Sequence, residues 1–321
     1  MSVVDVFTSP LQGTVRELIA FEGVGTHQGR HARMKIQPAP EGSGLVFVRA
    51  DVTDRENRIP VHHKWVERSA LCTTLRNAEG VCVQTVEHLL AALFLYGIDN
   101  AVIELTSEEV PILDGSARPY VQALQKAGRL VQKAQRRFLR ICKPIEVQEG
   151  NRKEALFPAS SGFSVSVACD YSAHQVPPES YESALTTQSF FRDIAPARSF
   201  GFFEEVTALR AQGLAKGSSL ENAVVFSEGK PLNPGGLRFK NEIVRHKVLD
   251  VLGDLALLGA PLVAHFSGNR PGHALSAQLV SELMARPESW EFTYPLQGTP
   301  ASVSPLSFLP VGEASQHCAS A

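Results

Sequence analysis

The chain has 321 residues, of which 44% are hydrophobic, and this length is sufficient for two domains with their own cores. Its formal net charge of −2 gives no electrostatic reason to expect nucleic acid as a partner. The five cysteines contain no C-x-x-C pair, which argues against a disulfide framework and favours a reducing compartment. The first residues lack the basic and apolar stretches of a signal peptide, and no apolar segment is long and uninterrupted enough to cross a membrane. We therefore expect a cytoplasmic protein without a transmembrane segment.

Strand-forming segments dominate the first 105 residues, without the regular alternation of strand and helix that is typical of a doubly wound sheet. We expect strands at residues 15–21, 33–37, 45–51, 66–76 and 101–105. An apolar helix follows Thr85, which is a suitable N-cap, and a second helix is expected near 117–127. The Gly23–Gly29 segment lacks the spacing and the following helix of a phosphate-binding loop, so it is interpreted as a tight turn between strands.

A basic segment from Lys126 to Arg137 separates this half from the next and is interpreted as a solvent-exposed linker. After it we expect strands at 138–149, 153–158, 163–170 and 262–267, and helices at 203–212 and 241–258. The two helices are stopped by Gly213 and Gly259. The predicted domains are therefore 1–132 and 133–300, followed by a loosely held tail at 301–321 that is rich in Ser, Ala and Pro.

The helix expected at 241–258 carries a polar stripe on an apolar body. His246, Asp250 and Asp254 recur at every fourth position, so their side chains project from nearly one face. Because unpaired buried charge is expensive, such a stripe must be satisfied by a partner. A bound metal ion is one answer, and a salt-bridged or solvent-facing side of the helix is the other.

The helix that follows Thr85 brings a third candidate ligand. Glu87 and His88 lie in its first turn, where side chains face a cavity or an interface. Together with His246 and Asp250, His88 would give two histidines and one carboxylate, which is the composition of a catalytic zinc site with one position left for water. Glu87 would then be free to act as a base. Alternatively, Glu87 only interacts with the positive helix end and His88 has no special role.

His273 lies in a turn that leads from the strand 262–267 into a helix. Loops that follow strands on a rigid scaffold often carry catalytic groups. A helix-capping or surface histidine is the alternative reading of this residue.

Five motifs occur in order along the chain. They are TVEHLL at 85–90, ILDGSA at 112–117, RSFGF at 198–202, VRHKVLD at 244–250 and GHAL at 272–275. Together they resemble the zinc-dependent UDP-3-O-acyl-N-acetylglucosamine deacetylases of lipid A biosynthesis, over nearly the whole chain. The resemblance implies an α+β fold with two domains of similar topology, each a β-sheet packed on helices. The helices would be sandwiched between the sheets, with the active site in the inter-domain cleft.

The resemblance also implies the reaction and its groups. The chain would hydrolyse the N-acetyl group of an acylated UDP-glucosamine and release acetate, which is the committed step of lipid A biosynthesis. The implied ligands of Zn²⁺ are His88, His246 and Asp250. The implied catalytic residues are Glu87 as base, His273 as acid and Asp254 as its orienting partner. Ser199 would lie near the oxyanion, and Lys247 near the oxyanion or a phosphate. The family usually carries Thr at position 199, so the hydroxyl is kept and the β-methyl is lost.

For the substrate, the resemblance identifies residues 198–226 as an insert that lines an acyl-chain passage. An ordinary core helix is the alternative for its helical part. The implied substrate-binding residues are Phe200, Phe202, Val206 and Ala215 for the acyl chain, Tyr171 for stacking on uracil, and Arg270 for the diphosphate. Relatives often have Lys at position 270, so the cation is retained with different geometry.

Two other functions fit the same residues. The chain could be a zinc amidase for another N-acetylated sugar nucleotide, or a catalytically silent sugar-nucleotide- or lipid-binding protein of the same fold. In each case we expect a monomer with a small-molecule partner.

Overall fold

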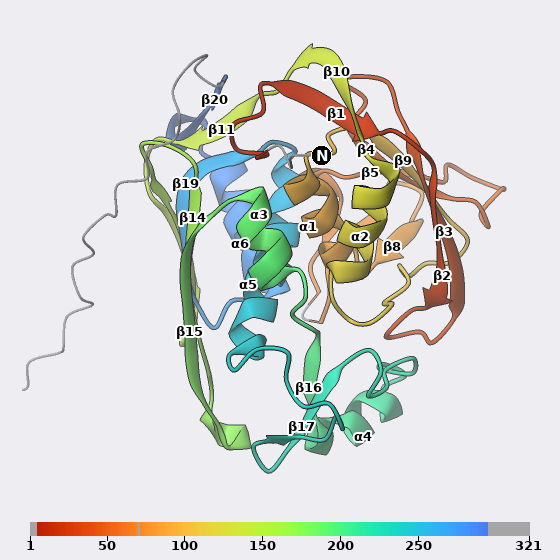
Figure 1. Cartoon of the computed structure of the whole chain (residues 1–321), viewed down its shortest axis with the longest axis vertical. Coiled ribbons are helices and arrows are strands. Elements are labelled where there is room, and N and C mark those ends of the chain that lie inside the picture. The colour runs from red at the N-terminus through yellow and green to blue at the C-terminus, as the bar shows by residue number, and fades with distance from the viewer. Residues whose placement is uncertain (1–4, 70, 295–321) are drawn as a thin grey trace, which may run out of the picture.

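The computed structural model describes residues 5–69 and 71–294. The predicted tail at 301–321 and the last residues of the predicted second domain lie outside the described residues. Two β-sheets form the outer layers and the main helices lie between them (Figure 1). This arrangement confirms the predicted α+β sandwich.

The N-terminal half supplies a five-stranded sheet with the order β2–β3–β9–β4–β5. Its strands are β2 (Ile19–Val24), β3 (His31–Pro38), β4 (Leu45–Arg49), β5 (Arg58–Pro60) and β9 (Ala101–Leu105). Only β4 and β9 pair in parallel within this sheet. In β3 the side chains alternate, and Ala32, Met34 and Ile36 are buried on the face toward the helices. The turn between β2 and β3 confirms the interpretation of the Gly23–Gly29 segment.

The C-terminal half supplies a seven-stranded sheet around β19. Its strands are β11 (Phe138–Ile141), β12 (Ile145–Glu149), β13 (Arg152–Pro158), β14 (Phe163–Tyr171), β15 (Val176–Leu185), β19 (Leu262–Asn269) and β20 (Trp290–Thr293). β19 is parallel to β11 and β14 and antiparallel to β13. Each half therefore combines one sheet of mixed strand direction with helices on one face.

The helices between the sheets are α1 (Glu87–Tyr96), α2 (Arg118–Ala127), α5 (Glu242–Leu255) and α6 (His273–Met284). Shorter elements are α3 (Thr187–Ser189), the π-helix η3 (Phe190–Ile194) and the 3₁₀ helices η1 (His63–Trp65), η2 (Ser172–His174), η4 (Ala256–Leu258) and η5 (Pro287–Ser289). The insert consists of β16 (Phe200–Phe202), α4 (Phe203–Ala211), β17 (Val224–Ser227) and β18 (Lys230–Pro231), and it projects at one end of the sandwich (Figure 1). None of the helices in the described part of the chain combines the length and apolar composition needed to cross a membrane.

Helices α1 and α5 cross in close contact at the centre of the layer. Eight of the ten residues of α1 are buried, as expected for a helix that is apolar on all sides. At the crossing, Gly253 of α5 faces the backbone of Glu87. A Cβ atom built on Gly253 would lie 2.1 Å from the Glu87 carbonyl oxygen, so only glycine permits this approach. The crossing brings the first turn of α1 next to the polar stripe of α5.

Four predictions about elements are wrong. The strand expected at 138–149 is two strands, β11 and β12. The strand expected at 15–21 is two strands, β1 (Leu11–Val15) and β2, because the chain turns between them. The strand expected at 66–76 is also two, β6 (Val66–Glu67) and β7 (Thr74–Arg76), which form a small sheet with β8 (Cys82–Gln84).

The fourth error concerns the basic segment, which is not a linker. Most of it forms β10 (Arg129–Gln135), paired antiparallel with β1. None of the residues of β10 is fully buried, so the segment lacks the regular alternation of apolar and polar side chains that would indicate a strand in the sequence. The proposed division between residues 132 and 133 falls inside β10 and stays a prediction.

Candidate active site

The first turn of α1 is positioned by a contact that the sequence did not indicate. Thr85 does not cap the helix, because its φ of 58° is left-handed and the N-cap position is Val86. Its hydroxyl instead donates to Glu109 Oε1 at 2.9 Å, and Glu109 is fully buried. Glu87 and His88 then leave the first helical turn toward α5. The N-cap prediction for Thr85 is therefore wrong, while the expected position of Glu87 and His88 in the first turn is confirmed.

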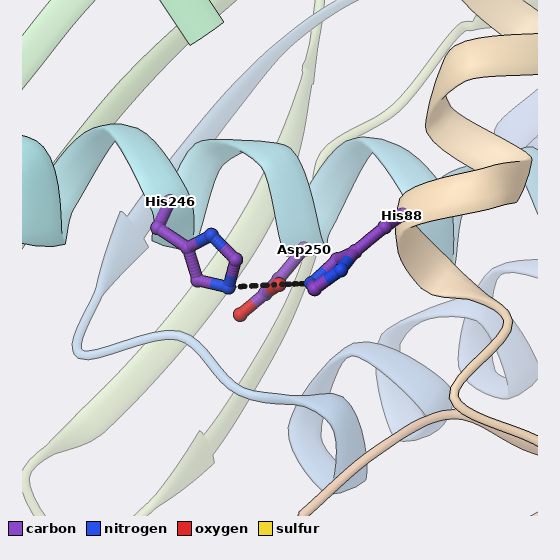
Figure 2. A group of neighbouring side chains, drawn as sticks. All are labelled: His88, His246 and Asp250. Carbon is purple, nitrogen blue, oxygen red and sulfur yellow. Dashed lines mark ion pairs between the residues drawn. The ribbon is translucent and has the colours of Figure 1, made fainter. Parts of the chain in front are cut away.

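His88, His246 and Asp250 converge on one point (Figure 2). The two histidine Nε2 atoms lie 3.4 Å and 3.2 Å from Asp250 Oδ1, and the three potential ligand atoms lie within 4.8 Å of one another. All three side chains are buried. The pairs do not meet hydrogen-bond geometry, and Oδ1 has no hydrogen-bond partner among the described residues. Such a buried, unpartnered acceptor between two imidazoles is what a metal ion would satisfy.

Neighbouring groups set the orientation of these side chains. His246 Nδ1 lies 3.1 Å from the Ala197 carbonyl and can donate to it, which leaves Nε2 as the free acceptor. Lys247 Nζ donates to Asp250 Oδ2 at 2.7 Å, which leaves Oδ1 facing the histidines. Both partners thus direct a lone pair to the point of convergence.

The electrostatics favour the ligand forms of these residues. Burial lowers the pKa of His246 to about 4, against the opposing effect of Asp250, so the imidazole is neutral at pH 7. Burial acts to raise the pKa of Asp250, but His246 and Lys247 outweigh it and hold this pKa well below its usual range. Burial acts to lower the pKa of Lys247, yet the Asp250 carboxylate shifts it upward overall. A neutral imidazole and a carboxylate are the protonation states that bind a divalent cation.

Next to this set lie two groups suited to proton transfer. His273, the first residue of α6, places Nε2 3.7 Å from Glu87 Oε1 and 3.9 Å from Asp250 Oδ2. Its Nδ1 lies 3.0 Å from Asp254 Oδ2. Burial acts to lower the pKa of His273, but Asp254 and Glu87 raise it to about 9, so the imidazole is protonated at neutral pH. Burial raises the pKa of Glu87, against the opposing effect of His273. A protonated imidazole and the carboxyl group of Glu87 therefore lie side by side.

Ser199 is placed beside the site by its neighbours. Two residues before it, the Ala197 carbonyl contacts His246, and one residue after it the Phe200 ring lies 6.1 Å from the His246 ring. The Ser199 backbone N–H donates to the Gly115 carbonyl at 2.7 Å. A Cβ atom on Gly115 would lie 1.9 Å from the Asn222 carbonyl oxygen, so this contact between the ILDGSA motif and the insert requires glycine.

Three of the predicted substrate-binding residues form an aromatic cluster. The ring of Tyr171 lies 5.4 Å from the rings of both Phe200 and Phe202. The ring of His174 stacks on that of Phe202, with 3.7 Å between the centroids. Arg270 donates to the Asp170 carbonyl at 2.8 Å, next to Tyr171 in the chain. The aromatic cluster lies next to the candidate metal ligands, because the Phe200 ring contacts the His246 ring.

The other two predicted substrate-binding residues lie farther along the insert. Val206 is half-buried on α4, and no residue of α4 is fully buried, so the alternative of a core helix is wrong. Ala215 is buried and is followed by Lys216, whose backbone N–H donates to the His27 carbonyl at 3.1 Å. The insert is therefore attached to the turn between β2 and β3.

Two residues close to the site were missed from the sequence. His27 lies in the turn that was set aside, and its buried Nδ1 has no hydrogen-bond partner among the described residues. Burial lowers the pKa of His27 against the opposing effect of Glu109, and the charge of His273 lowers it further. Thr73 contacts both Glu87 and Asp254. Neither residue belongs to a periodic pattern, so only their contacts in the fold reveal them.

Comparisons with known proteins agree with the motifs. A family model described as UDP-3-O-acyl N-acetylglycosamine deacetylase matches residues 12–285. A Phenylobacterium zucineum protein named UDP-3-O-acyl-N-acetylglucosamine deacetylase is 46% identical over 279 residues, which cover 87% of this chain and 95% of the relative. Proteins of the same name from Shewanella baltica and Shewanella sediminis are each 42% identical, over 282 residues (87% and 92%) and 306 residues (94% and 98%). The chain therefore belongs to the UDP-3-O-acyl N-acetylglycosamine deacetylase family.

Proposed function

We propose that this chain hydrolyses the acetamide of UDP-3-O-acyl-N-acetylglucosamine and releases acetate, in the committed step of lipid A biosynthesis, with Zn²⁺ as its cofactor. The observation that carries the proposal is the convergence of His88, His246 and Asp250 beside Glu87 and His273, in a chain of this family. The three metal ligands alone would not specify a reaction. The adjoining base and acid are the groups that amide hydrolysis requires.

The donor set fits a zinc ion. Two imidazole nitrogens and one carboxylate oxygen are typical of catalytic rather than structural zinc, and the unpartnered Asp250 Oδ1 is a buried acceptor that a cation would satisfy. When bound, the metal supplies Lewis acidity, which polarises the acetamide carbonyl and lowers the pKa of a water molecule to about 7.

The proton transfers follow from the two side chains next to the ligands. Glu87 takes a proton from the attacking water, because its carboxylate is buried, lies beside the ligand set and is not needed as a ligand. His273 gives its proton to the departing glucosamine nitrogen as the C–N bond breaks. Asp254 stabilises the protonated imidazole and fixes Nδ1–H on its own side, so that Nε2–H faces the reaction. Water is consumed, and acetate and the free amine are formed.

Two further groups stabilise the charge that develops on the carbonyl oxygen. The Ser199 hydroxyl is a donor with a free rotamer, since it lacks the β-methyl of threonine. Lys247 adds a buried positive charge that is already held by Asp250 Oδ2. We propose that both act on the oxyanion.

For the rest of the substrate, we propose that the insert binds the 3-O-acyl chain. Phe200, Phe202, Val206 and Ala215 would contact it, and each buried methylene contributes about 0.8 kcal/mol. Tyr171 would stack on uracil and Arg270 would approach the diphosphate. The enzyme would act as a cytoplasmic monomer on this small molecule.

Acetate release by the purified, zinc-loaded protein tests the proposal. Three substrates should be compared under the same conditions: the acylated sugar nucleotide, UDP-N-acetylglucosamine without the acyl chain, and a different N-acetylated sugar nucleotide. We expect release from the first only. Release from the third substrate alone would favour a zinc amidase of other specificity, and binding without release would identify a silent protein of the same fold.

A further inference from the structure

Thr73 contacts the candidate base and the candidate acid through two different groups. It ends the loop that joins β6 to β7, it is 4% exposed, and it belongs to the N-terminal half. Its backbone N–H contacts the side chain of Glu87 on α1. Its hydroxyl contacts the side chains of Asp254 on α5 and His273 on α6. A single loop residue therefore touches all the proton-transfer groups of the site.

The backbone of Thr73 fixes the carboxylate of Glu87. Its N–H donates to Glu87 Oε2 at 3.0 Å, and its carbonyl accepts a hydrogen bond from the Val86 N–H at 3.4 Å. Because Oε2 is held in this way, Oε1 is the oxygen that faces His273 Nε2 at 3.7 Å. The rotation of the Glu87 carboxylate thus depends on where the loop is held.

The hydroxyl of Thr73 fixes the partner of the acid. Oγ1 donates a hydrogen bond to Asp254 Oδ1, and it lies 3.2 Å from His273 Nδ1. A hydroxyl has one proton, so a hydroxyl that donates to Asp254 offers only its lone pairs to the imidazole. His273 Nδ1–H therefore meets two acceptors, Thr73 Oγ1 and Asp254 Oδ2 at 3.0 Å. Both stabilise the protonated ring in one orientation.

We propose that Thr73 is a positioning residue that sets the separation and the orientation of the base, Glu87, and the acid, His273. The inference rests on the proposed function. Glu87 and His273 come from helices of different halves, and no hydrogen bond between them is formed at 3.7 Å. Thr73 links them through two contacts, one from its backbone N–H to Glu87 and one from its hydroxyl to His273. Displacement of reacting groups by about 1 Å can cost 10²-fold in rate, so such a link has a catalytic consequence.

The neighbouring Thr74 provides a matched control. It is also buried to 4% exposure, but its hydroxyl contacts only the Cys72 thiol at 3.7 Å among the described residues. Thr73→Val removes the hydroxyl and keeps a β-branched side chain of similar shape, and Thr73→Ser keeps the hydroxyl. Thr74→Val makes the same change one residue away.

The experiment measures kcat, KM and metal content for the wild type, Thr73→Val, Thr73→Ser and Thr74→Val, each loaded with zinc. We expect Thr73→Val to lose about 10–100-fold in kcat, as is typical when a partner of an active-site group is removed, with KM and zinc content unchanged. Thr73→Ser and Thr74→Val should stay close to the wild type. Rescue by serine would separate the hydroxyl from a general packing effect.

A second readout does not depend on turnover. In protein labelled with ¹⁵N-histidine, the Nδ1–H proton of His273 should resonate far downfield, and we expect Thr73→Val, but not Thr73→Ser, to shift it. A Thr73→Val protein with wild-type kcat, an equal loss in Thr74→Val, or an imidazole resonance that valine leaves unchanged would overturn the inference. If the wild type itself releases no acetate, the proposed function fails, and the resonance still decides the role of Thr73.

Discussion

The substitution Gly253→Ala tests whether the close approach of α1 and α5 sets the geometry of the candidate active site. The added Cβ would lie 2.1 Å from the carbonyl oxygen of Glu87, 2.6 Å from its carbonyl carbon and 2.7 Å from its Cα. All three are backbone atoms, so no side chain can rotate away. Because optimal contacts between heavy atoms are about 3.5–4.0 Å, the first turn of α1 must retreat from α5 by more than about 1 Å.

Two energies act on stability in opposite directions. Overpacking of a core costs about 1–3 kcal/mol, whereas alanine is better than glycine in a helix by about 1 kcal/mol. The free energy of unfolding should therefore fall by no more than about 2 kcal/mol. The site is more sensitive, because His88 and Glu87 move with the first turn while His246 and Asp250 stay on α5. A displacement of this size should lower kcat/KM about 100-fold and weaken metal binding.

The assay compares kcat/KM, zinc affinity and urea unfolding for Gly253→Ala and for Gly235→Ala. Gly235 is exposed, and a Cβ built there meets no atom within 4 Å, so its variant controls for the substitution itself. We expect the large effect on activity and metal binding only at position 253. Wild-type zinc affinity and kcat/KM in Gly253→Ala would show that this crossing does not set the ligand geometry.

Four further substitutions test individual roles. Asp250→Ala should keep the helix but lose zinc affinity, because it removes the charged ligand, and stoichiometric zinc with full activity would contradict the ligand set. Glu87→Gln should keep fold and zinc and lose about 10²–10⁴-fold in kcat, and loss of metal instead would make Glu87 a ligand. The pKa of His273 is raised to about 9, so the acid is protonated below this pH and kcat should decline as the pH rises through it. His273→Gln should abolish this alkaline limb of the profile, and an unchanged limb would assign the acid role to another group. Ala215→Trp should lower kcat/KM for a long-chain substrate much more than for one with a short 3-O-acyl group, whereas equal losses would indicate misfolding or a distant pocket.

The common face of the candidate ligands on α5 could be predicted, because the spacing of residues along a helix fixes the direction of their side chains. His246, Asp250 and Asp254 are four residues apart, so their common face follows from the helical repeat before any tertiary contact is known. The structure divides this stripe between two tasks. Asp250 faces the two histidines, and Asp254, one turn on, faces His273. Spacing identified the stripe, and the family resemblance, not the spacing, distinguished the two aspartates.

Where the position of a side chain depends on the path of a loop, the sequence carried no signal or a wrong one. Thr85 has the composition of an N-cap, but the left-handed backbone directs its hydroxyl to Glu109, 24 residues later. Thr73 follows no period, and its side-chain partners are 181 and 200 residues away. The basic residues of β10 suggest a linker because the strand lies at the surface, where its pairing with β1 does not require apolar side chains.

This contrast suggests how the site tolerates change. Helices α1, α5 and α6 carry the candidate reactive groups, but some of the hydrogen bonds that orient those groups come from residues outside the helices, such as the Ala197 carbonyl for His246 and Thr73 for Glu87 and Asp254. A backbone donor or acceptor survives substitution of its side chain, provided that the loop keeps its path. The hydroxyl of Thr73 does not survive in this way. The contact of the Ala197 carbonyl with His246 should therefore survive any substitution that preserves the path of the loop, whereas loss of the hydroxyl at position 73 should be costly.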